Sequence, residues 1–250
     1  MRNRFLFFLL MLNIQLAHGQ PMTDAKAIIQ AAMDHWRGES SYSEMTMTIH
    51  RSDWERTMSM RGWTQGADNS LVRVTTPAKD AGNATLILDK DMWSFSPKIN
   101  RVIKVPSSMM GQSWMGSDFS NHDVARDDDI LKEYDHRLLQ TREENGFTVY
   151  EIEAVPHATA AVVWGRQVIQ VREDFVLLKE DYYDQDNKLV KSLVTSEIKT
   201  LSGRTVATRQ RMSNLENPSE WTEISVSQIE FGIDINANLF SLSNLRNPRH

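Results

Sequence analysis

The chain has 250 residues, with 28 basic and 33 acidic side chains, a formal net charge of −5 and no cysteine. The acidic balance argues against a nucleic-acid partner and against tight docking on anionic lipid headgroups. The missing thiols exclude disulfides and cysteine-based catalysis, so the fold must depend on a sizeable apolar core.

The first 19 residues have the layout of a secretory signal peptide. A short basic start, MRNR, precedes the apolar run FLFFLLML, and the small residues Ala17 and Gly19 stand just before Gln20. The run is shorter than the roughly 20 apolar residues that span a bilayer. We therefore expect cleavage after Gly19 and an exported, unanchored mature chain, residues 20–250, that forms one domain and is monomeric in the periplasm.

The mature chain begins with an amphipathic helix. In TDAKAIIQAAMDHWRG, Thr23 or Asp24 is the N-cap, apolar residues such as Ile28 and Ile29 recur at helical spacing, and Gly38 ends the helix. One face is apolar, so we expect the helix to pack on another part of the fold.

After this helix the apolar residues recur every second position. SEMTMTIHR places Met45, Met47 and Ile49 on one face, and WERTMSMRGWTQG does the same with Met58 and Met60. Four short strands follow, NSLVRVTTP, NATLILDK, MWSFSP and NRVIKVP, separated by Gly, Asn, Asp and Pro. Connections this short cannot carry parallel crossovers, so the pattern predicts an antiparallel meander.

The second half continues in the same way, with the strands HRLLQTREE, FTVYEIEAVP, RQVIQVREDFVLLKEDYYD, LVKSLVTSEIKTL, RTVATRQRMSN and WTEISVSQIEFG. No long polar linker separates the two halves. The sequence thus predicts a mainly β protein with a few helices, whose eleven or twelve strands form one strongly curved sheet with a concave face.

One histidine and four aspartates after position 121 resemble a cluster of metal ligands. They comprise His122, Asp123, Asp127, Asp128 and Asp129. However, the alternating ligand spacing of a calcium loop and its closing glutamate are missing, and acidic residues suit the first turn of a helix. We therefore interpret DVARDDDILKEYD as a short helix and expect no metal site.

Sequence motifs of known catalytic sites are also missing. No histidine lies in a Gly-x-Ser-x-Gly or HExxH motif, and no Gly-rich loop joins a strand to a helix. A glycosidase with two carboxylates stays open, because such a pair needs only to be close in space. We expect no enzyme activity and no cofactor.

The methionines carry the functional signal. The mature chain has eleven, and eight of them lie between residues 45 and 115. Methionine is unbranched and polarizable, so it lines surfaces that fit varied apolar shapes, although it also fills gaps in ordinary cores. We interpret the cluster as the lining of an apolar ligand cavity. The predicted cavity and lid residues are Met45, Met47, Ile49, Met58, Met60, Leu86, Leu88, Trp93, Phe95, Met109, Met110, Trp114, Met115 and Phe119.

Residues 105–124, VPSSMMGQSWMGSDFSNHDV, fit neither a strand nor a helix. Large apolar side chains stand here among Ser, Gly and Gln, and leaving so many of them in water would be unfavourable. We predict a mobile lid segment at the mouth of the cavity, because glycine and methionine let such a segment exchange contacts at low strain.

The motifs together resemble a known family. MTMTIHR…MRGWT, LVRVTTPAKDAGNATLIL, MWSFSPKINRVIKVP, YYDQDNKLVKSL and NLFSLSNL make the mature chain similar to the LolA-like periplasmic outer-membrane lipoprotein-sorting proteins. This resemblance implies a large unclosed antiparallel β-barrel of about eleven strands, with a lid of helices and loops over a hydrophobic cavity. It also implies acyl chains of lipoproteins or other lipids as cargo, and as partners an inner-membrane transporter of the resistance-nodulation-division (RND) type and an outer-membrane acceptor.

We therefore predict a periplasmic carrier that binds acyl chains and shuttles them towards the outer membrane. The first alternative is a non-catalytic envelope adaptor that uses the same fold without lipid cargo. The second is a weak enzyme acting on lipid or glycan.

Overall fold

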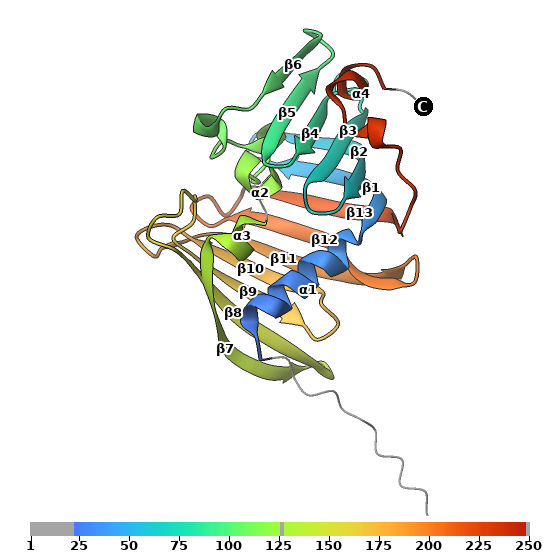
Figure 1. Ribbon diagram of the computed structural model, residues 1–250. Coiled ribbons are helices and arrows are strands. Elements are labelled where there is room, and N and C mark those ends of the chain that lie inside the picture. The colour runs from blue at the N-terminus through green and yellow to red at the C-terminus, as the bar shows by residue number, and fades with distance from the viewer. Residues whose placement is uncertain (1–22, 126–127, 249–250) are drawn as a thin grey trace, which may run out of the picture.

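The computed structural model describes residues 23–125 and 128–248 (Figure 1). The predicted signal peptide, residues 1–19, and Asp127 lie outside the described residues. The helices are α1 Ala25–Arg37, η1 Ser107–Met109, η2 Trp114–Gly116, α2 Asn121–Ala125, α3 Asp129–Lys132, η3 Ala237–Leu239 and α4 Leu242–Arg246. The strands are β1 Ser40–His50, β2 Glu55–Gln65, β3 Asn69–Thr76, β4 Ala84–Leu88, β5 Asp91–Ser96, β6 Arg101–Lys104, β7 Tyr134–Glu144, β8 Phe147–Pro156, β9 Arg166–Arg172, β10 Leu177–Tyr183, β11 Leu189–Leu201, β12 Arg204–Asn214 and β13 Trp221–Phe231.

All of these strands form one antiparallel sheet of 13 strands, in the order β6-β5-β4-β3-β2-β1-β13-β12-β11-β10-β9-β8-β7. Strands that follow one another in the chain are neighbours in the sheet, except β6 and β7, which are its two edges. The first strand, β1, pairs with the last strand, β13. The sheet is therefore an unclosed barrel, and the connecting segment, residues 105–133, runs between its two edges.

This architecture confirms the predicted fold class. One predicted strand, however, is two strands in the structure. The stretch 166–183, expected as one strand, turns back at residues 173–176. There the amide of Phe175 donates to the carbonyl of Arg172, and Phe175 has a φ of 66°. Arg172, Glu173 and Asp174 interrupt the apolar alternation at this turn, and the predicted strand overlooked this signal.

Helix α1 begins and ends where the capping residues predict. The side chain of Asp24 accepts a hydrogen bond from the amide of Ala27 (3.2 Å), and Gly38 follows with a φ of 65°. Figure 1 shows α1 lying across the half of the sheet that β7 to β12 form. Its buried Ile28 and Ile29 pack against β7, β8 and β9. No helix in the described parts of the chain is long and apolar enough to span a membrane.

In the other half of the sheet, β1 to β6, two different segments of the chain pack against the two faces. On one face the methionines of β1 and β2 pack beneath the connecting segment. On the opposite face, Phe240 and Leu245 of the C-terminal segment pack on β3, β4 and β5. Alternate residues of β4 illustrate this, since Leu86 contacts the C-terminal segment and Ile87 contacts the methionines.

Candidate functional site

An extensively lined, mostly apolar cavity, which we call the main cavity, lies between α1, the connecting segment and the half of the sheet that β9 to β12 form. It has a volume of about 260 Å³. Its walls are Ile29, Ala32, Met33, His35, Trp36 and Arg37 of α1, Phe119, His122, Asp123 and Ile130 of the connecting segment, and Tyr134, Trp164, Gln167, Ile169, Val171, Phe175, Val176, Leu177, Glu180, Tyr182, Leu193, Val206, Ala207 and Gln210 of the sheet and its loops.

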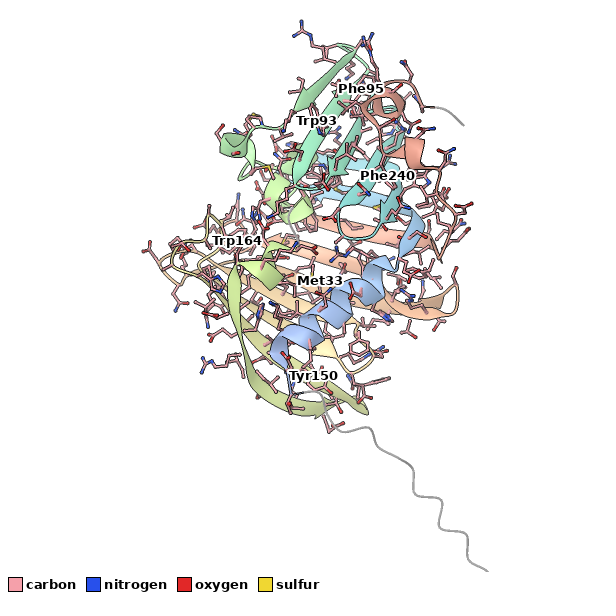
Figure 2. All side chains as sticks on the ribbon, viewed as in Figure 1. Met33, Trp93, Phe95, Tyr150, Trp164 and Phe240 are labelled. Carbon is pink, nitrogen blue, oxygen red and sulfur yellow. The ribbon has the colours of Figure 1, made fainter. Side chains whose placement is uncertain are left out.

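Most of this wall is apolar, because the apolar face of β9 lies opposite the apolar face of α1. On β9, Ile169 and Val171 point inward at every second position, and on α1 the helical spacing brings Ile29 and Met33 to the same side. Figure 2 shows Met33 and Trp164 in the half of the molecule that carries α1, whereas Trp93, Phe95 and Phe240 lie in the other half. The cavity can thus desolvate an apolar chain.

Several polar residues interrupt the apolar wall, and two of them, Gln167 and Glu180, lie on neighbouring strands. Gln167 of β9 stands opposite Tyr182 of β10, and Glu180 of β10 stands opposite Ile169 of β9. Gln167 is only 7% exposed, and its Oε1 has no hydrogen-bond partner. Because Gln167 and Glu180 are diagonal neighbours on one sheet face, their Cα atoms are about 7–8 Å apart. They form a polar patch in the wall, which we call the polar floor.

Two tyrosines border this floor in their protonated form. Burial raises the pKa of Tyr182 well above its ordinary value, and the negative charges of Glu180 and Asp123 raise it further. Burial likewise raises the pKa of Tyr134, with smaller contributions from Glu180, Asp129 and Asp123. Both hydroxyl groups therefore keep their protons at neutral pH, and neither adds a charge to the cavity.

Helix α1 closes the cavity through polar contacts at its C-terminal end. Arg37 Nη2 donates to Asp128 Oδ1 (2.6 Å), which joins the helix to the connecting segment. Arg204 Nη1 donates to the carbonyl oxygen of His35 (2.6 Å), which joins the helix to β12. Trp36 is 37% exposed although it also lines the cavity, so it marks the mouth.

The structure brings eight of the predicted cavity and lid residues together in one cluster, away from the main cavity. They are Met45, Met47, Ile49, Met58, Met60, Met110, Trp114 and Met115. Met47, Ile49, Met58 and Met60 are almost fully buried by one another and by the connecting segment. In this structure their own side chains fill the concave face of β1 and β2.

The remaining predicted residues lie in three other places. Leu86, Leu88, Trp93 and Phe95 are on the opposite face of the sheet, in the cluster with Phe240. Met109 is 40% exposed, and Phe119 lines the main cavity. A second cavity, of about 400 Å³, is lined in part by Met58, Phe95 and Met115. The lipid-binding role of the predicted set stays a prediction.

Residues 105–124 are held in place by buried polar contacts. Trp114 Nε1 donates to Thr85 Oγ1 of β4 (3.0 Å). The buried carboxylate of Asp118 accepts from Arg51 Nη1 (3.0 Å) and from Thr222 Oγ1 (2.6 Å), and its backbone carbonyl accepts from Lys191 Nζ (2.6 Å). These contacts join the segment to three parts of the sheet. We therefore expect α1, rather than this segment, to move when the cavity opens.

Of the acidic residues after position 121, Asp123 belongs to the cap of the short helix α2, whereas the side chain of Asp128 makes no cap hydrogen bond at α3. The side chain of Asp123 accepts from the amide of Ser120 (2.8 Å) and from Trp164 Nε1 (3.1 Å), and His122 lies 3.5 Å from Asp129. Among residues 23–125 and 128–248, no group of three or more His, Asp or Glu side chains could hold a metal ion.

Reasoning from the sequence missed most of the main cavity. It assigned α1 as a packing helix and residues 166–183, which hold β9 and β10, as one ordinary strand. One signal was present, because Gln167 and Glu180 occupy positions where the alternation of their strands calls for an apolar residue. A polar residue in the apolar phase of a strand is a feature that needs a partner or a ligand.

Comparisons with known proteins identify the fold. A family model described only as that of an uncharacterized protein matches residues 66–247. No curated protein matches the chain. The crystal structure of a DUF1329 family protein from Desulfovibrio piger is similar with a TM-score of 0.79 and 29% identity, covering 90% of this chain and 100% of that one.

Two further crystal structures carry descriptions that match the predicted resemblance. A domain from Vibrio parahaemolyticus, assigned as an outer membrane lipoprotein-sorting protein, has a TM-score of 0.75 and 23% identity and covers 89% of this chain and 100% of its own. A LolA superfamily protein from Nitrosomonas europaea has a TM-score of 0.73 and 20% identity, covering 89% of this chain and 99% of that one. The chain therefore belongs to the family of uncharacterized proteins that the model describes, and it has the LolA-like fold of the outer-membrane lipoprotein-sorting proteins, as the sequence motifs predict.

Proposed function

We propose that this protein is a periplasmic, non-catalytic carrier that holds an acyl chain in the cavity beneath α1. The observation that supports it most directly is the apolar cavity of about 260 Å³, closed by one amphipathic helix. Burying each methylene group of a chain there contributes about 0.8 kcal/mol, so ten carbons supply several kcal/mol after ordering costs.

The size of the cavity restricts the cargo in the closed state. Small-molecule sites usually measure about 300–1,000 Å³. A volume of about 260 Å³ lies just below this range, so it suits a single chain. A lipoprotein carries several acyl chains, and α1 would have to move away from the sheet to admit more than one.

We further propose that residues 1–19 are removed on export and that residues 20–250 act as one domain and as a monomer. In the carrier hypothesis an inner-membrane transporter of the RND type supplies the cargo and an outer-membrane acceptor receives it. N-terminal sequencing of the exported protein tests the cleavage site. Coincident thermal transitions, followed by tryptophan fluorescence and far-ultraviolet circular dichroism, test the single domain.

The decisive experiment is to purify the mature protein from an envelope extract without detergent, extract it with organic solvent and analyse the extract by mass spectrometry. We expect about one acyl chain per protein. The hydrocarbon probe diphenylhexatriene, which fluoresces in apolar surroundings, should bind the lipid-free protein with the same stoichiometry. If no lipid co-purifies and the probe does not bind, the carrier hypothesis is wrong.

The envelope adaptor is the second candidate, and one observation favours it. The concave face of β1 and β2 is filled by the protein's own methionines and by Trp114, so eight of the residues predicted to hold cargo pack against one another instead. An adaptor would bind neither lipid nor probe. It would instead remain bound to the transporter when membranes are solubilised.

A further inference from the structure

The polar floor of the main cavity has an unmet hydrogen-bonding capacity. Gln167 Oε1 is buried and has no hydrogen-bond partner among the described residues. A buried amide oxygen without a partner is unfavourable, and native proteins rarely keep one without a reason. Here the atom belongs to a side chain that lines a cavity, so a bound molecule can supply the missing donor.

The surroundings of Gln167 exclude a close anionic group. Glu180 lies on the same face of the sheet, and Asp123 also lines the cavity. The neighbouring Tyr182 and Tyr134 are uncharged at neutral pH because burial raises the pKa of each phenol. The cation that lines the same cavity, Arg37, already contacts Asp128 at 2.6 Å. A carboxylate or phosphate placed against this floor would therefore meet negative charge.

An uncharged hydrogen-bond donor suits the polar floor. An uncharged hydroxyl or amide N–H can donate to Gln167 Oε1, and a hydroxyl can also accept from a tyrosine hydroxyl. Most of the remaining wall is apolar, so an apolar chain suits the part of the ligand beyond this group.

We propose that the main cavity selects amphiphiles whose apolar chain carries an uncharged hydrogen-bond donor, a hydroxyl or an amide, and that Gln167 is the residue that recognises this donor. The inference rests on the proposed function, because it assumes that the cavity holds an apolar chain. It goes further in naming the chemical class of the polar group.

Three ligands with the same ten-carbon chain test the proposal, namely 1-decanol, decyl methyl ether and decanoate. The alcohol donates a hydrogen bond, the ether only accepts, and decanoate is anionic. Each displaces diphenylhexatriene from the purified, lipid-free protein in a fluorescence titration. We expect 1-decanol to bind about 3- to 10-fold more tightly than the ether, the range for one net hydrogen bond, and decanoate to bind most weakly.

The variant Gln167→Met replaces the amide by an apolar side chain of similar shape. We expect it to lose the preference for the alcohol over the ether, because the thioether offers no comparable acceptor. Gln210→Met is the matched control, because Gln210 lines the same cavity but its Nε2 already donates to Thr195 Oγ1 (3.2 Å). This control should keep the preference.

The outcomes separate the two hypotheses. If the unmodified protein does not bind diphenylhexatriene, the proposed function itself is wrong. If the probe binds but the alcohol and the ether compete equally, or if decanoate competes best, the selection for a donor is wrong. The same conclusion follows if Gln167→Met keeps the preference. The comparison of alcohol and ether in the unmodified protein decides the matter even if the variant does not fold.

Discussion

Arg37 Nη2 and Asp128 Oδ1 lie 2.6 Å apart, and this ion pair joins the C-terminal end of α1 to the connecting segment above the main cavity. The side chains are only 9% and 17% exposed. A charged hydrogen bond this well shielded from water is stronger than a surface pair. It holds the helix against the part of the chain that bridges the two edges of the sheet.

Replacing Asp128 by Asn should loosen this closure. The buried guanidinium of Arg37 loses its carboxylate partner at this position, so we expect the free energy of unfolding to fall by about 3 kcal/mol. Urea titration measures the loss, and stopped-flow fluorescence measures how fast diphenylhexatriene enters. Entry should become faster, because α1 leaves the sheet more often.

Lys132→Ala is the control for this pair. Lys132 Nζ lies 3.7 Å from Asp128 Oδ2, but its side chain is exposed, so its removal should cost less than about 0.5 kcal/mol. Equal effects of Asp128→Asn and Lys132→Ala would contradict the closing role of Arg37.

Filling the cavity from α1 should block binding without unfolding the protein. Ala32 lines the cavity, so a phenylalanine ring at this position takes space that a ligand would need. We expect Ala32→Phe to weaken binding of diphenylhexatriene by about tenfold or more, which corresponds to about 1.4 kcal/mol. Ala31→Phe adds the same ring one position earlier, on a residue that does not line the cavity, and should bind the probe normally. An unchanged affinity in Ala32→Phe would place the ligand elsewhere.

The connecting segment should be part of the core rather than a detachable lid. Met110 and Trp114 are 7% and 6% exposed and pack among the methionines of β1 and β2. Replacing both with Ser should therefore lower the free energy of unfolding by about 4 kcal/mol or more, because two large side chains leave a cavity behind. The same change at Met109, which is 40% exposed, should cost less than about 0.5 kcal/mol. A double variant that melts like the unmodified protein would show instead that the segment is the mobile lid that its composition suggests.

Acidification should lower the stability of the folded protein through the partly buried imidazole of His136. Burial lowers the pKa of this imidazole, although its Nε2 contact with the carbonyl oxygen of Ile130 (2.8 Å) acts in the opposite direction. Below about pH 6.5 the unfolded chain binds a proton at this position and the folded chain does not, so stability falls as the pH drops towards the lowered pKa of the folded state. Thermal melts between pH 8 and pH 5 should show a smaller pH dependence in His136→Gln. If His157→Gln, at an exposed histidine, flattens the curve equally, the effect does not belong to His136.

Local signals in the sequence were sufficient for the elements and for the class of fold. Asp24 and Gly38 mark the ends of α1, because capping depends only on neighbouring backbone groups. Alternation of the type seen at Met45, Met47 and Ile49 marks the strands, and short connections require an antiparallel meander. The turn at Phe175 was missed, although the three charged residues before it, 172–174, break the apolar alternation and mark a turn.

Only the tertiary structure decided which apolar residues form a cavity and which fill the core. Alternation shows that Leu86 and Met58 each face one side of a strand, but it cannot show that their sides are opposite ones, covered by the C-terminal segment and the connecting segment. It also cannot show that α1 stands away from β9 and β10 far enough to leave a space beside Gln167. The sequence by itself determined the helix, the strands and the curved sheet, because these depend on local periodicity and capping. The cavity and its polar floor depend on how distant segments meet, and that is a property of the packed molecule alone.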